Sequence, residues 1–209
     1  LALAEGLAAS PNLLKDDLSE FEAEARRVFA RLPDAWILVA DVEGRPLVNG
    51  FEPNDASVRA GALPPRPPKA IEAQRRAFAT LAPVLSGVRR GPVSGMIIAT
   101  VEVPVFRDGA PFRALALTMT MAPLNRLLAA RKMPEGWLAG IIDAEGLYAA
   151  RVPDGERLAG EPASEGWRAT RGKAGLFEFR SRDGLAVLNE NALSAFGGWT
   201  VGVAVAKEA

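Results

Sequence analysis

One short motif occurs twice in the chain at corresponding places. Residues 36–44 form an apolar run that ends in Asp-x-Glu-Gly, and residues 137–146 repeat this design. Each run is followed by a second short strand-like run, at 45–48 and at 147–151, as expected of a hairpin whose turn is the Asp-x-Glu-Gly element. The repeat predicts two copies of one small structural unit, and this constrains the fold more than any other feature.

The repeat continues downstream. Arg-Asp-Gly triplets at 107–109 and 182–184 each lie between two longer apolar runs. The order of short hairpin, intervening segment and long hairpin therefore occurs twice. This order favours two α+β units, each with an antiparallel sheet, over one large domain.

Composition excludes several classes of function. The chain has 209 residues, of which 49% are apolar and 24% charged, as in a folded globular protein. Its 25 basic and 25 acidic residues give no net charge, so we expect no nucleic-acid partner. Cysteine and histidine are absent, which removes disulfides, thiolate nucleophiles, the commonest general base and the commonest metal ligand. We therefore expect no metal, no cofactor and no catalytic residue.

The sequence gives no sign of a membrane span. Its longest uncharged stretch, residues 191–206, is shorter than the roughly 20 apolar residues needed to cross a bilayer. No basic segment precedes an apolar core at the beginning, so no signal peptide is predicted. The abrupt beginning and end suggest a piece of a longer protein.

Residues 1–32 have a helical pattern with a restart at Ser10 and Pro11 and a further cap at Asp16 or Asp17. One apolar stripe follows the last part at spacings of three and four: Leu18, Phe21, Ala25, Val28, Phe29 and Leu32. A stripe of that size must be covered, so we expect it to pack on the modules or on a twin helix.

The first half carries more connecting structure than the second. A proline-rich loop at 51–68, whose run at 63–68 could cap the module or bind a partner as polyproline, precedes a helix at 69–80 and a short strand at 84–88. A long hairpin follows, with strands at 95–105 and 111–121. Its second face carries Met96, Ile98, Thr100 and Glu102 and is only partly polar, so both faces of the sheet should be covered. In the second half, 152–173 should contain only one or two short turns of helix.

Residues 137–151, 157–164 and 198–203 resemble the double Cache sensor domains of bacteria, most closely those of alphaproteobacterial histidine kinases. The resemblance covers nearly the whole chain and implies two tandem PAS-like modules behind a long N-terminal helix. The expected domains are an N-terminal helical segment at 1–34, a membrane-distal module at 35–121, a connecting helix at 122–136 and a membrane-proximal module at 137–209.

The resemblance also implies a function. Such domains are extracytoplasmic, periplasmic ligand-sensing regions of inner-membrane receptors, flanked by transmembrane segments and fused to a histidine kinase, diguanylate cyclase or chemoreceptor module for signal transduction. Members that bind amino acids carry an arginine and aromatic cluster in the distal helix. Here that helix offers Arg75, Arg76 and Phe78 with no Trp or Tyr beside them, so amino-acid specificity does not carry over.

A ligand is expected in the first module, because the loop and helix at 51–80 could roof a cavity there. Two guanidiniums, a hydroxyl and a flexible backbone at 89–95 could grip a carboxylate or phosphate, which makes an anionic small molecule one option. The candidate ligand-binding residues are Arg89, Arg90, Ser94, Met96 and Thr118. Solvated arginines and ordinary packing of the other residues are the alternative interpretation.

Other prominent residues favour a structural role. Asp41 and Asp143 occupy equivalent turns and should each accept hydrogen bonds from their own backbone, rather than act as an acid/base pair. We expect Arg151 to pair with Asp143 across its hairpin. Three tryptophans at strand starts are expected to be core anchors: Trp36, Trp137 and Trp199.

Three functions remain open. The first is a ligand sensor that forms a homodimer through its N-terminal helix. The second is a dimerisation or scaffold module without a ligand, and the third is a small histidine-free hydrolase. The hydrolase is disfavoured because no serine lies in a Gly-x-Ser-x-Gly or Ser-x-x-Lys pattern.

Overall fold

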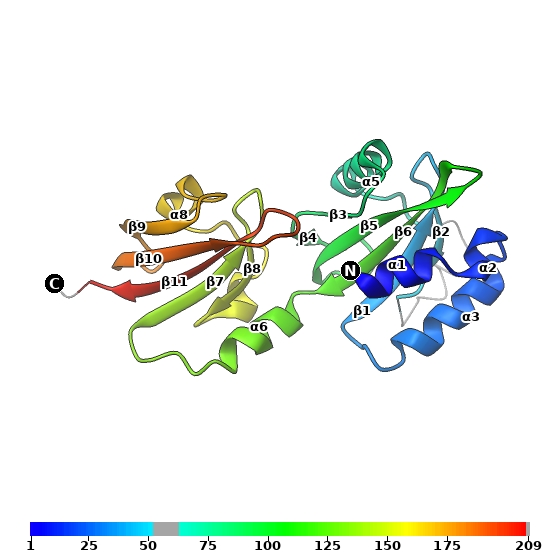
Figure 1. Ribbon diagram of the computed structural model, residues 1–209. Coiled ribbons are helices and arrows are strands. Elements are labelled where there is room, and N and C mark those ends of the chain that lie inside the picture. Colours follow the sequence, from blue (N-terminus) through cyan, green and yellow to red (C-terminus); the bar gives the residue numbers. More distant parts are fainter. Residues whose placement is uncertain (52–62, 208–209) are drawn as a thin grey trace. The chain divides into compact units, whose positions relative to one another are not determined.

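The computed structural model describes residues 1–51 and 63–207, and the chain divides into two compact units (Figure 1). The first unit comprises Leu1–Ser86 and Gly91–Thr120, and the second comprises Gly87–Arg90 and Met121–Ala209. Most of the predicted loop at 51–68 lies outside the described residues. The chain therefore passes from the first unit to the second, returns, and passes over again.

Each unit is built on its own antiparallel sheet. The first has the strand order β2-β1-β6-β5-β3, and the second has the order β8-β7-β11-β10-β9. The two orders match strand for strand: β2, β1, β6, β5 and β3 of the first sheet correspond to β8, β7, β11, β10 and β9 of the second. The six strands of the first sheet are β1 Ala35–Ala40, β2 Pro46–Asn49, β3 Val84–Leu85, β4 Arg89–Arg90, β5 Ile97–Arg107 and β6 Ala110–Thr120, of which β4 pairs with β5 beside the path given above. The strands of the second sheet are β7 Trp137–Ile142, β8 Tyr148–Val152, β9 Gly175–Arg180, β10 Ala186–Leu193 and β11 Thr200–Ala206. The α+β prediction with two sheets is confirmed.

Three N-terminal helices cover one face of the first sheet: α1 Ala2–Ala8, α2 Pro11–Leu14 and α3 Leu18–Phe29. Pro11 opens α2, and the Asp17 side chain caps α3 by accepting a hydrogen bond from the Glu20 amide. Phe21 is fully buried in the core of this unit, with Leu18, Val28 and Phe29 packed against it. The predicted stripe is therefore covered by its own unit as far as Phe29, whereas Leu32, beyond the end of α3, is exposed.

The opposite face of the first sheet is packed by α5, Pro68–Thr80, which contacts β5 and β3 (Figure 1). Its buried side consists of Ala70, Ala73, Gln74 and Ala77. Small residues let the helix approach the strands closely, and Gln74 brings a polar group into this layer. Both faces of the sheet are covered, as the weak alternation of the long hairpin predicted.

The second unit has shorter helices: α6 Ala122–Ala129, α7 Gly155–Leu158 and α8 Glu165–Ala169. Its core gathers Ile142, Tyr148, Leu158, Ala163 and Trp167. The two short helices between β8 and β9 are the turns predicted for 152–173. In the part of the chain that the structure describes, no helix is both long and apolar enough to span a membrane.

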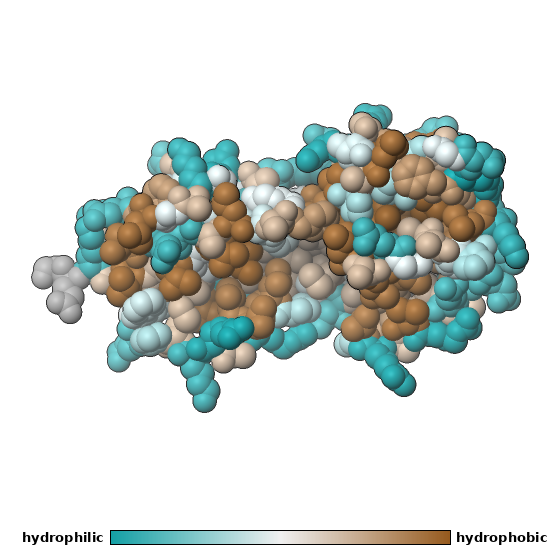
Figure 2. Space-filling model, viewed as in Figure 1, coloured by the Kyte–Doolittle hydropathy of each residue, from teal (hydrophilic) through white to brown (hydrophobic). Residues whose placement is uncertain are grey.

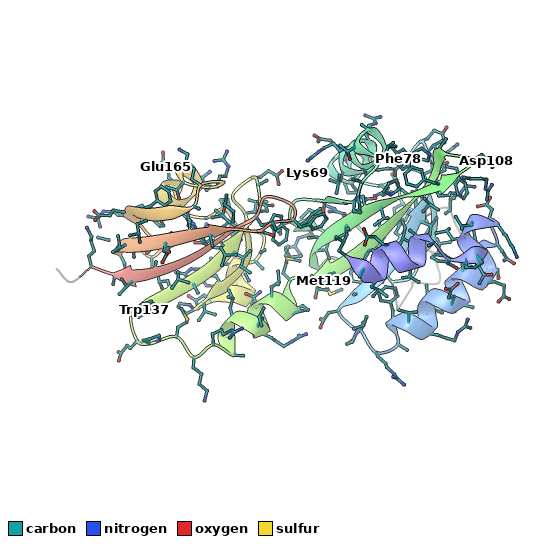
Figure 3. All side chains as sticks on the ribbon, in the orientation of Figure 1. Lys69, Phe78, Asp108, Met119, Trp137 and Glu165 are labelled. Atoms are coloured by element: carbon teal, nitrogen blue, oxygen red, sulfur yellow. The ribbon has the colours of Figure 1, made fainter. Side chains whose placement is uncertain are left out.

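Two predictions about this architecture are wrong in detail. Trp36 and Trp199 are buried, but Trp137 is 40% exposed at the first position of β7 (Figure 3), because the core of this unit gathers near the other end of that strand. The strand predicted at 84–88 is only β3, and Arg89–Arg90 form the separate short strand β4. Figure 2 shows further apolar side chains in patches on both units, edged by polar residues, which is common on protein surfaces.

Candidate functional site

A polar patch lies on the face of the first sheet that α5 covers. Strand pairing aligns two rows of residues across β1, β6 and β5: Trp36 with Thr118 and Thr100, and Leu38 with Ala116 and Glu102. These residues alternate with Ile37 and Val103, which belong to the core on the other face. The polar members Thr100, Glu102 and Thr118 are all buried.

An ion pair occupies the centre of this patch. Glu102 is fully buried, and one of its carboxylate oxygens pairs with the guanidinium of Arg66, which is 7% exposed. Arg66 also donates to the side-chain oxygen of Gln74 from α5. Because burying two charges is costly unless they are paired and hydrogen-bonded, these three residues fix one another in place.

The cluster continues as a chain of hydrogen bonds. The Gln74 amide nitrogen donates to the backbone oxygens of Asp41 at 2.8 Å and Val42 at 3.3 Å, which ties α5 to the first turn. On the other side, Ser86 Oγ accepts from the amide of Thr100 at 2.9 Å and lies 3.0 Å from its hydroxyl. Side-chain hydrogen bonds through Arg66 and Gln74 thus connect α5 with Glu102 of the sheet. We call Arg66, Gln74, Ser86, Thr100 and Glu102 the buried polar cluster.

Paired opposite charges under a helix can recognise a charged ligand. A guanidinium fork suits a carboxylate, and a buried carboxylate suits an ammonium group. The hydroxyls of Thr100 and Thr118 on the sheet can donate or accept hydrogen bonds. A ligand entering here would exchange partners with groups that already satisfy one another.

The structure divides the predicted ligand-binding residues between the units. Arg89 and Arg90 form β4, which pairs with β5 in the first sheet although residues 87–90 group with the second unit, whereas Ser94, Met96 and Thr118 belong to the first. Arg90 is exposed, Met96 is 38% exposed, and Ser94 Oγ accepts from the Met96 amide at 3.3 Å. Thr118 alone among the five lies in the patch beneath α5. The five-residue site remains a prediction.

Sequence reasoning missed Arg66, Gln74 and Glu102 as site residues. Glu102 gave a signal, because it is a lone carboxylate in a long apolar strand. Gln74 gave a weaker one, since it follows Ala73 on the apolar side of a helix. Arg66 stands in a proline run, and nothing in that run shows that its side chain turns inward.

The corresponding place in the second unit is filled by a side chain. By strand register, Asn189 and Asn191 of β10 stand where β5 has Thr100 and Glu102. The Trp167 indole of α8 covers Gly140 and Gly202, where a Cβ atom would lie only 2.7 Å and 2.6 Å from the ring, and its Nε1 donates to Asn191 Oδ1 at 2.9 Å. The two paired glycines therefore make the space that the indole fills.

The two turn aspartates have the structural role that their sequence predicted. Asp41 accepts from the amide of Arg45 at 2.8 Å, and Asp143 accepts from the amides of Glu145 and Leu147 at 3.0 and 2.8 Å. Burial raises the pKa of Asp41, whereas hydrogen bonds from the Arg45 backbone and side chain lower it. The lowering effects together are larger, so the pKa of Asp41 lies below its ordinary value. Gly44 and Gly146 close the turns with φ of +88° and +85°, which suit glycine.

The predicted pair of Arg151 with Asp143 is wrong. Arg151 pairs with Asp183, in the turn between β9 and β10, while the Asp143 carboxylate is occupied by backbone amides. In antiparallel register Arg151 lies opposite Gly140, which is three residues before Asp143. Among the described residues, no group of three or more acidic side chains is arranged to hold a metal ion.

Comparison with known proteins rests on structure. No family model matches the sequence, and no curated protein matches it. The ligand-binding domain of the Pseudomonas aeruginosa chemoreceptor PctB with L-Gln matches with a TM-score of 0.71 at 15% identity, covering 99% of this chain and 81% of that one. The extracellular domain of rpHK1S-Z16, described as a histidine kinase, matches with a TM-score of 0.70 at 15% identity, covering 99% and 92%.

The chain has the double Cache fold. A third match to this fold is the ligand-binding domain of P. aeruginosa PctC with GABA, with a TM-score of 0.67 at 19% identity over 99% of this chain and 88% of that one. The resemblance found in the sequence is therefore confirmed at the level of the fold. All three double Cache structures are sensory domains of receptors.

Proposed function

We propose that the chain is the extracytoplasmic ligand-sensing domain of a bacterial inner-membrane receptor, with a histidine kinase as its output. Support comes from solved neighbours that match nearly the whole chain and are extracellular domains of histidine kinases or ligand-binding domains of chemoreceptors. In this proposal the first unit is membrane-distal and the second membrane-proximal. The neighbours are sensory rather than catalytic domains, which gives the hydrolase alternative no support.

The ligand in this proposal binds in the first unit, between α5 and the sheet. The observation that carries it is the buried polar cluster, because a buried charged pair is costly even when it is hydrogen-bonded and therefore points to a role. We propose a ligand with a carboxylate, which Arg66 would bind, and an ammonium group, which Glu102 would bind. Amino acids are the first compounds to test, since PctB was solved with L-Arg and L-Gln, CtaA with L-leucine and PctC with GABA.

Signalling in this proposal requires that the ligand prefer one of two states of the domain. A ligand that takes over Arg66 and Glu102 would separate them and alter the contacts of Gln74 with the first turn. It would also alter Ser86, which directly precedes the segment that crosses to the second unit. The ligand would thereby change the hydrogen bonds at Asp41 and those at Ser86.

A thermal-shift screen of amino acids and related carboxylates tests this proposal. A ligand at about a hundred times its dissociation constant should stabilise the fold by roughly 2.7 kcal/mol. Arg66→Ala should abolish that gain, whereas Arg75→Ala, on the exposed side of α5, should preserve it. The proposal fails if no compound in the screen is bound, or if both variants respond like the native chain.

The turn at 89–95 is the second candidate site for an anion. If Arg90 grips the ligand together with Ser94, Arg90→Ala should weaken binding by roughly 1.5 to 3 kcal/mol, the scale of a charged hydrogen bond. Calorimetry on Arg66→Ala and Arg90→Ala with the same ligand separates the two sites. Unchanged affinity in Arg90→Ala would eliminate the turn.

We also propose a homodimer formed through the N-terminal helices. The apolar side of α3 packs within its own unit, so a dimer would use the outer side, where Glu22 and Arg26 form an exposed ion pair. Sedimentation of the isolated chain tests this directly. A dimer that binds no small molecule would favour the scaffold alternative instead.

A further inference from the structure

The second unit encloses a small cavity on the sheet face that Trp167 covers. Its volume is about 20 Å³, which is room for one group the size of a water molecule. The wall includes both apolar and polar side chains, among them Tyr148, Arg151, Trp167, Phe179, Ser181 and Asn189.

Arg151 brings a buried positive charge to this cavity. Its side chain is only 3% exposed, and its Nη1 donates to the backbone oxygen of Pro153 at 2.8 Å. The other terminal nitrogen, Nη2, pairs with a carboxylate oxygen of Asp183. The backbone thus holds one side of the guanidinium, while the other side faces an exchangeable carboxylate.

Asp183 can leave without disturbing its turn. Its side chain is 36% exposed, so its carboxylate can be hydrated in place. The turn is held by Ser181, whose Oγ accepts from the amides of Asp183 and Leu185 at 3.2 Å, and whose amide donates to Leu185 O at 2.8 Å. Arg151, in contrast, is fixed in the interior and needs an anion wherever Asp183 goes.

We propose that the second unit binds a small monocarboxylate, which replaces Asp183 on the Arg151 guanidinium and places its alkyl group in the cavity. This site is separate from the one under α5 and does not depend on it. Tyr148 supplies a second polar group, because its hydroxyl can donate a hydrogen bond. Burial raises the pKa of this phenol. The size of the cavity favours acetate over longer chains.

The affinity should be modest in the native chain. One carboxylate replaces another on the Arg151 guanidinium, so the exchange yields little binding free energy. In addition, the tethered Asp183 competes at an effective concentration on the order of millimolar or higher. Asp183→Asn removes the competing charge and should therefore tighten binding of the ligand, which general damage to the fold would not do.

The test is a titration of the whole chain with sodium acetate, with sodium chloride at equal ionic strength as the reference. The indole N–H signal of Trp167, one of four tryptophans, is followed by NMR and assigned by its loss in Trp167→Phe. Asp183→Asn should bind acetate at least tenfold more tightly than the native chain, and Arg151→Lys at least tenfold more weakly. Butyrate should leave the signal unshifted.

Two matched variants locate the binding. Asp154→Asn, also an exposed acidic residue of this unit, should leave the acetate affinity unchanged, and so should Arg75→Ala, at an exposed residue of α5 in the first unit. The proposal is overturned if acetate shifts the Trp167 signal in neither the native chain nor Asp183→Asn. Equal affinity in those two proteins, or loss of binding in Arg75→Ala, would overturn it as well.

Discussion

The amide of Val88 donates a 2.7 Å hydrogen bond to Oδ2 of Asp143, inside the second unit. Both residues are completely buried. Val88 follows β3 by three positions and comes before β5, so it belongs in sequence to the first repeat. The Asp143 carboxylate thus binds the amide of Val88, which comes from outside its turn. The equivalent carboxylate of Asp41 accepts from Arg45, within its own turn.

Asp143→Asn should destabilise the second unit by about 1 to 3 kcal/mol, because one of its three backbone donors would face an amide nitrogen instead of an oxygen. Urea unfolding measures the loss. Hydrogen exchange should show faster exchange at Val88, Glu145 and Leu147. Asp154→Asn, at an exposed ion pair, should change stability by less than about 1 kcal/mol.

Gly202→Ala should cost about 1 to 3 kcal/mol, because its Cβ would lie 2.6 Å from the Trp167 ring and 2.8 Å from Asn189 Oδ1. Gly6→Ala in α1 is the control. Its Cβ would meet nothing within 4 Å, so the exchange should be neutral or stabilise the helix by up to about 1 kcal/mol. Thermal unfolding of the two variants compares them, and equal midpoints would show that the indole yields easily.

Phe21→Ala should destabilise the protein by about 3 to 5 kcal/mol, as expected for a fully buried phenylalanine. Leu32→Ala, at a residue that is 42% exposed, should have a much smaller effect. Chemical unfolding of both variants measures the difference. A loss below about half a kcal/mol for Phe21→Ala would mean that α3 does not pack on the sheet.

Asp41 should make part of the stability depend on pH. Its pKa is lowered in the folded chain from the ordinary 3.8, so its contribution is present above that pH and is lost as pH falls through the lower folded value. Asp41→Asn should remove this acid-dependent part. Unfolding midpoints of both proteins from pH 5 down to about 2.5 test this, and parallel curves would contradict it.

Much of the fold could be predicted because local chemistry determines it. The turns at Asp41 and Asp143 need an acceptor and a glycine in fixed places, and the cap at Asp17 needs a short side chain. The buried polar cluster could not be predicted in the same way. Arg66 and Glu102 are 36 positions apart, and only the packing of α5 on the sheet brings them together. Trp167 was missed for the same reason, since its two glycine partners come from β7 and β11.

The interleaving of the chain limits how this protein can be dissected. A cut between Thr120 and Met121 would give a second half without Gly87–Arg90, the tetrapeptide that belongs to its unit. Asp143 would then lose the Val88 amide and expose a carboxylate that is otherwise sealed. Receptor chimeras that exchange one sensory module for another therefore need two further junctions, one on each side of this tetrapeptide, in addition to the one at 120. A recombination event at residue 120 alone would join an Asp143 turn from one protein to a Gly87–Arg90 segment from another.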